Sequence, residues 1–111
     1  MKNFSKFLEE EKSMIVYLID ELEYVVHGEG LKPDERDKEY EELQPELVMF
    51  SISLQEIDFN DIEHIPSLQE VLDLLHFIDQ SSVFTTLSCY YEEGEELLHR
   101  LKRFKSIFLS H

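Results

Sequence analysis

The feature that most constrains the fold is a regular repeat of apolar residues in the last third of the chain. Its members, one of them a glycine, alternate in steps of four and three residues: Val83, Leu87, Tyr90, Gly94, Leu97, Leu101, Phe104 and Phe108. Such spacing places all of them on one side of an α-helix. The repeat therefore predicts a long helix over residues 82–109, with Ser82 as its N-cap.

Gly94 leaves an alternative open for the first part of this segment. Glycine in a helix interior costs about 1 kcal/mol relative to alanine, so it marks either close helix packing or a break. With a break, residues 82–91 would form a strand, because alternate positions there share one face: Val83, Thr85, Leu87 and Cys89.

The N-terminal segment predicts a second long helix, over residues 3–26. Its apolar residues recur at steps of three, four or seven: Phe4, Leu8, Ile15, Leu18, Leu22 and Val25. The sequence His27-Gly28-Glu29-Gly30 follows. It would end the helix, because glycine readily adopts the left-handed backbone conformation found at helix C-termini.

The middle of the chain is ambiguous. Residues 31–44 are mostly polar and predict a connection that contains a short helix capped by Asp34. Pro45 suits the first turn of a following helix over residues 46–57. A competing alternation would instead make residues 47–55 a strand: Val48, Phe50, Ile52 and Leu54.

A loop over residues 59–65 and the cap Pro66-Ser67 precede one more helical stripe, formed by Leu68, Val71, Leu72, Leu75 and Ile78. Together these patterns predict an all-α fold, a small helical bundle with long N- and C-terminal helices. They predict a single acidic domain over residues 1–111. The alternative is an α+β fold with a small antiparallel sheet from residues 47–55 and 82–91.

Charge is distributed unevenly along the chain. The sequence has 10 Lys and Arg against 25 Asp and Glu, a net charge of −15. Between Glu39 and His99 there is no Lys or Arg, whereas that span holds fifteen carboxylates. Ordinary domains interleave both signs, because unrelieved self-repulsion destabilises the compact state. The pattern is compatible with a merely solvated surface, and it favours an electronegative face that meets a basic partner.

The same composition excludes several classes of function. So negative a chain is not expected to bind nucleic acid or an anionic membrane through a general basic surface. A single cysteine, Cys89, cannot form an intramolecular disulfide, which favours a reducing, cytoplasmic setting. No glycine-rich phosphate loop and no nucleophile-elbow motif occur, so we expect neither a cofactor nor catalytic residues.

Two acid-Leu-Leu-His segments raise the question of a metal. Asp73 precedes His76 and Glu96 precedes His99 by three residues, the spacing that di-iron bundles use. Both histidines lie off their apolar stripes, so we expect them to face outward and to hold no metal. A metal-dependent bundle enzyme is therefore less favoured than the two non-enzymatic interpretations given below.

Two clusters combine carboxylates with tyrosines, as a surface for arginines and lysines would. The predicted partner-binding residues are Glu39, Tyr40, Glu41, Glu42, Glu46, Tyr91, Glu92, Glu93, Glu95 and Glu96. The purely structural alternative is that the tyrosines belong to the core and the glutamates belong to a solvated helix face. As a class, small acidic chains with patterned carboxylates resemble DNA-mimic proteins and nuclease inhibitors, although no specific motif carries the resemblance.

The sequence thus predicts a non-enzymatic protein that inhibits or regulates a basic partner, such as a nucleic-acid-binding enzyme, by presenting carboxylates in place of phosphates. The alternative is a helical adaptor or chaperone-like scaffold whose apolar core is completed by a partner helix or by a second copy in a homodimer. Eight Phe and five Tyr leave room for such an unfilled groove.

Overall fold

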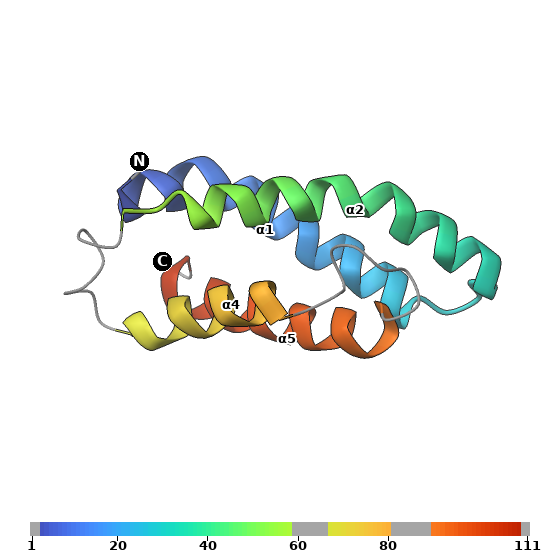
Figure 1. The fold of residues 1–111 in the computed structure, drawn as a ribbon. Coiled ribbons are helices and arrows are strands. Elements are labelled where there is room, and N and C mark those ends of the chain that lie inside the picture. The colour runs from blue at the N-terminus through green and yellow to red at the C-terminus, as the bar shows by residue number, and fades with distance from the viewer. Residues whose placement is uncertain (1–2, 59–66, 81–89, 110–111) are drawn as a thin grey trace.

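The computed structural model describes residues 3–58, 67–80 and 90–109. Within these ranges the chain forms helices and no strand: α1 (Phe4–His27), α2 (Pro33–Gln55), α4 (Leu68–Gln80) and α5 (Tyr90–Phe108). The helices alternate in direction and lie in two layers, α1 with α2 and α4 with α5 (Figure 1). Each packs against two neighbours in the cyclic order α1, α2, α4, α5. The all-α bundle is confirmed.

The strand alternative is wrong for residues 47–55, which are helical. Of the other strand segment, residues 82–89 lie outside the described residues, while Tyr90 and Tyr91 belong to α5. The predicted Ser82 cap and the loop over residues 59–65 also lie outside the described ranges.

Helix α1 matches its prediction closely. Asn3 caps it, since its side-chain oxygen accepts a hydrogen bond from the Lys6 backbone N–H at 2.7 Å. The helix ends at His27, but not by the predicted route, because Gly28 is extended (φ −62°). Gly30 instead takes the positive φ of 81°, which reverses the chain toward α2.

Helix α2 corrects the prediction for the middle of the chain. Residues 33–55 form one continuous helix that starts with Pro33, so Asp34 lies in its first turn rather than at its cap. Pro45 lies inside the helix and does not begin a new one. Buried residues continue through it in steps of three and four: Tyr40, Leu43, Leu47, Phe50 and Leu54. Pro45 itself is exposed, so water can bond the carbonyl that its missing N–H leaves unpaired.

For α4 and α5, the predicted apolar stripes agree with the buried residues to different degrees. In α4, Val71 and Leu74 are buried while Leu72 is 37% exposed, so the predicted stripe was shifted by part of a turn. In α5 the predicted seam is confirmed where side chains are described, since Leu97, Leu101 and Phe104 are buried. Gly94 does not break α5, and it packs against α1: a Cβ at Gly94 would lie in ordinary van der Waals contact with Val26, at 3.4 Å.

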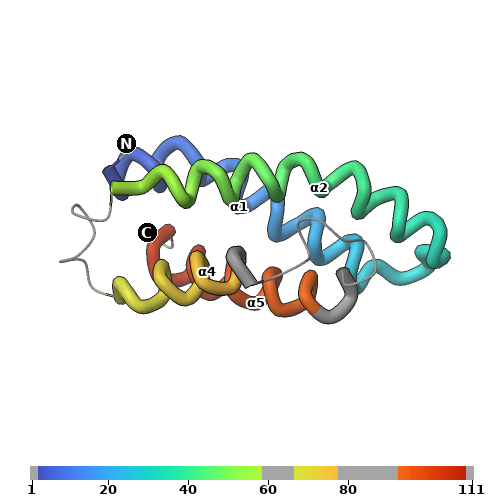
Figure 2. The backbone as a smooth tube through the Cα atoms, viewed as in Figure 1, coloured from blue at the N-terminus to red at the C-terminus, as the bar shows by residue number. Residues whose placement is uncertain are grey.

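Phenylalanines close one end of the bundle. The Phe4 ring of α1 lies 5.1 Å from the Phe108 ring of α5, and the Phe7 ring lies 6.2 Å from the Phe50 ring of α2. Phe104 joins them edge-on, 6.3 Å from Phe4. Three helices therefore meet in one aromatic cluster, and the first and last described residues lie at the same end of the bundle (Figure 2).

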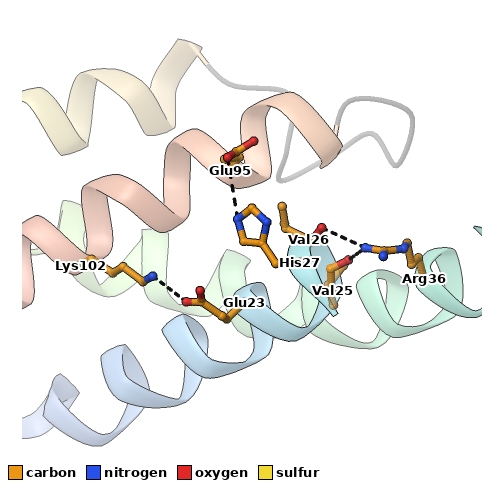
Figure 3. A network of polar contacts seen from close by, with 7 residues as sticks. All are labelled: Glu23, Val25, Val26, His27, Arg36, Glu95 and Lys102. Carbon is orange, nitrogen blue, oxygen red and sulfur yellow. Dashed lines mark hydrogen bonds and ion pairs between the residues drawn. The ribbon is translucent and has the colours of Figure 1, made fainter. Parts of the chain in front are cut away.

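One arginine fixes the turn between α1 and α2. The Arg36 guanidinium donates to the carbonyl oxygens of Val25 at 2.5 Å and Val26 at 2.9 Å (Figure 3). It also donates to the carbonyl oxygen of Gly28 at 2.7 Å. These carbonyls lie at the C-terminal end of α1, where helical partners are absent and the helix dipole favours positive charge. Arg36 thus ties the first turn of α2 to the last turn of α1.

We expect truncation of the α5 seam to destabilise the protein. Leu97→Ala or Leu101→Ala should each lower the free energy of unfolding by about 2–5 kcal/mol, because both side chains are buried and leave a cavity. Urea denaturation followed by circular dichroism measures this. The same truncation at exposed Leu72 should cost clearly less, and equal losses at all three positions would contradict the packing described for α4 and α5.

We also expect Arg36→Ala to lower the free energy of unfolding by about 1.5–3 kcal/mol, because it removes charged donors from part-buried carbonyls. The matched control is Lys38→Ala, which removes the same charge from an exposed position two residues further along α2. Denaturant titrations of the two variants should differ by this amount. If they are equally stable, Arg36 does not hold the turn.

Candidate partner-binding surface

The first predicted cluster lies on α2, and the structure divides it. Tyr40 is 0% exposed and belongs to the core, so its assignment to the partner-binding surface is corrected. The reason is its place in the buried three-and-four repeat of α2, which outweighs its acidic neighbours. Glu41 and Glu42 are exposed, and Glu39 and Glu46 are half-buried.

Another tyrosine takes the place that was expected for Tyr40. Tyr17 of α1 is 45% exposed. Partial burial raises its pKa above the ordinary value of 10.0, and nearby carboxylates raise that pKa further: Glu21 of α1 and Glu46, Glu39 and Glu42 of α2. We call these five residues the acidic aromatic face. Its members come from α1 and α2, two helices that pack side by side (Figure 1).

The carboxylates that α2 contributes to this face are not held in ion pairs in the described part of the chain. Within the described residues, Glu39, Glu42 and Glu46 form no ion pair. Arg36 lies close by in sequence, but its guanidinium is bound to the end of α1. The negative charge of the acidic aromatic face is therefore available to a partner.

The second predicted cluster, on α5, is in a different electrostatic state. The Glu95 carboxylate lies 3.8 Å from His27 of α1, and Glu96 accepts from Arg100 at 2.9 Å (Figure 3 shows the first pair). Glu93 is half-buried, while the side chains of Tyr91 and Glu92 lie outside the described residues. Part of the negative charge on α5 is therefore paired with other side chains of the same chain.

Sequence reasoning missed Tyr17 because that residue lies off the apolar stripe of α1. Tyr17 and Glu21 are four residues apart and share a helix face, which is a signal that a sequence can give. Their nearness to Glu39, Glu42 and Glu46 comes only from the packing of α1 against α2.

The acid–histidine pairs meet partly, around a shallow cavity of about 260 Å³ between α4 and α5. Asp73, Glu96 and His99 line it together with Glu70, Arg100 and Arg103. His76 is exposed and does not line this cavity.

Two of the acidic side chains that line this cavity form ion pairs with its arginines. Arg103 lies 2.8 Å from Glu70, and Arg100 lies 2.9 Å from Glu96. In the described part of the chain, no three His, Cys, Asp or Glu side chains are placed to hold a metal ion. These carboxylates are therefore engaged in ion pairs, one within α5 and one between α4 and α5, rather than grouped to coordinate a metal.

The fold and surface define a small antiparallel helical bundle with an acidic face. The chain matches no protein-family model, and no curated protein or solved structure matches it either. Among the described helices, none is both long and apolar enough to cross a membrane.

The acidic aromatic face predicts a measurable titration. Replacing Glu39, Glu42 and Glu46 with glutamine should lower the Tyr17 pKa toward its ordinary value, because three carboxylates that oppose the tyrosinate are lost. The ring-carbon chemical shift of labelled Tyr17, followed by NMR against pH, reports this pKa. The control replaces Glu23, Glu95 and Glu96 with glutamine, which also removes three charges, but these carboxylates do not surround Tyr17. An equal change of the Tyr17 pKa in the control variant would contradict the geometry.

The sign of the accompanying pH effect follows from the same shift. The folded state holds the Tyr17 proton more tightly than the unfolded chain does. The contribution to stability is therefore complete below the ordinary pKa of 10.0 and is lost as the pH rises through the higher folded-state pKa. The triple glutamine variant should lose stability less steeply in this alkaline range.

Proposed function

We propose that the protein is a non-enzymatic, cytoplasmic interaction protein that inhibits or regulates a basic partner, most simply a protein that handles nucleic acid. The acidic aromatic face would occupy the positively charged cleft of that partner, with its carboxylates standing in for phosphates. Such binding is fast because of electrostatic steering, and it weakens steeply with salt.

The observation that carries this proposal is the set of unneutralised carboxylates around Tyr17. These carboxylates come from two packed helices and gather around one ring, so they form a concentrated negative surface. An arginine that meets this face can pair with Glu42 or Glu46 and stack on the half-exposed ring of Tyr17. Glu41 extends the same negative field along the exposed side of α2.

The glutamates of α5 are secondary in this proposal. Glu95 and Glu96 already face His27 and Arg100, so a basic partner would have to displace those contacts. Exposed pairs of this kind contribute about 0–1 kcal/mol each, so displacement costs little, but the net attraction is smaller than on the acidic aromatic face.

The test is an affinity capture in which two baits of equal charge are compared. One carries Glu39→Gln, Glu42→Gln and Glu46→Gln, and the other carries Glu23→Gln, Glu95→Gln and Glu96→Gln. We expect the wild type and the second bait to retain a basic protein at low salt and to release it at high salt, and the first bait to retain much less. Mass spectrometry identifies the protein that is retained.

The association rate of that identified protein then tests whether binding depends on the acidic aromatic face. The acidic-aromatic-face variant should associate about tenfold or more slowly than the α5 variant, and nucleic acid should compete with the wild type for the partner. Equal rates for both variants, or binding that nucleic acid leaves unchanged, would contradict phosphate mimicry.

A further inference from the structure

Helix α2 is apolar on two sides. Its inner side supplies the core, and its outer side carries a second stripe at steps of three, one and three: Pro45, Val48, Met49 and Ile52. In this outer stripe Val48 is 37%, Met49 60% and Ile52 45% exposed, and Pro45 is exposed as well. Single exposed apolar residues are ordinary, but four on two successive turns form the kind of ridge with which helices pack.

The charges that border the outer stripe restrict what can cover it. Glu41 and Glu42 lie at one end of the stripe and Glu56 at the other, all three exposed. Antiparallel pairing of two copies about the middle of the stripe would place Glu41 opposite Glu56 of the partner subunit. Parallel pairing would place each glutamate beside its own counterpart. A second copy is therefore opposed by like charges.

We propose that the outer stripe of α2 docks an amphipathic helix of the partner protein whose own apolar stripe is flanked by lysine or arginine. The inference rests on the proposed function, since both require a basic partner, and it adds that the contact is apolar as well as ionic. Apolar residues fill the centre of the interface, and Glu41, Glu42 and Glu56 receive the basic residues at its rim.

The acidic aromatic face and the outer stripe are continuous around α2. Glu42 and Glu46 of the acidic aromatic face border the outer stripe directly, on the side toward α1, because the helix turns by about 100° per residue. A partner helix on the outer stripe therefore has its basic flank against the charges that surround Tyr17. One docked helix would use both surfaces.

The test uses a synthetic probe, so it does not depend on finding the natural partner. The probe is a helical peptide of leucine and lysine, about 18 residues long, or five helical turns, with the leucines on one stripe. A peptide of the same composition in scrambled order keeps the charge and loses the stripe. Calorimetry measures the affinity of both peptides for the wild type and for three variants.

The stripe variant is Met49→Gln with Ile52→Gln, which keeps helix-forming side chains at exposed positions and so preserves the fold. The control is Tyr24→Gln, which removes an equally exposed apolar side chain from α1. We expect the stripe variant to lose at least about tenfold in affinity for the striped peptide and the control to lose little. The scrambled peptide should bind all of these proteins weakly and alike.

The third variant separates this inference from the proposed function. If Glu39→Gln, Glu42→Gln and Glu46→Gln weakens peptide binding while the stripe variant does not, the docking inference is overturned and the ionic proposal stands. If neither peptide binds the wild type at low salt, both are overturned. Self-association that sedimentation detects in the wild type and not in the stripe variant would assign the stripe to a second copy instead, which also overturns the inference.

Discussion

The end of α1 exposes carbonyl groups that its own helix cannot satisfy, and Arg36 supplies their donors. Three carbonyl oxygens converge on one guanidinium, which belongs to the first turn of the next helix. This contact sets where α2 begins relative to α1. The remaining features of the α1–α2 layer depend on that register, including the approach of Glu39, Glu42 and Glu46 to Tyr17.

Several basic residues in the described part of this acidic chain make contacts within the protein. Lys102 of α5 lies 2.6 Å from Glu23 of α1 (Figure 3). Arg100 and Arg103 pair with Glu96 and Glu70, and Arg100 also lies over the Phe77 ring at 5.0 Å. These contacts join α5 to both of its neighbours. Because these cations pair with carboxylates of α1, α4 and α5, they do not neutralise the glutamates of α2. That unneutralised charge is the physical basis of the proposed function.

Helix α2 combines two roles that ordinarily fall to different elements. Its inner side fills the core with Tyr40, Leu47 and Phe50, and its outer side exposes Met49 and Ile52 to solvent. A helix with apolar residues on both sides is stable in water only if one side is tolerated in solvent or is covered by something else. In the proposed docking, the bordering glutamates oppose pairing of the outer stripe with a second copy and favour a basic partner helix.

The sequence by itself determined the helices wherever an apolar stripe ran uninterrupted. It placed α1 within one residue at each end and identified the seam of α5 through Gly94, because a period near 3.6 is a local property of the chain. It failed at α2, where Pro45 suggested a boundary although the buried repeat from Tyr40 to Leu54 crosses it. Tertiary packing decided that point, because the burial gained along a whole helix outweighs the single hydrogen bond that proline removes.

Only the tertiary structure decided the composition of the candidate site. The sequence predicted an acidic cluster with a tyrosine, and the structure places three of its glutamates, Glu39, Glu42 and Glu46, near a tyrosine. It assigned the wrong ring, since Tyr40 points into the core and Tyr17 lies among the carboxylates. Which side chains of α1 meet those of α2 depends on the rotation of both helices about their axes. That rotation is fixed by the shared core and by Arg36, and neither can be read from one segment alone.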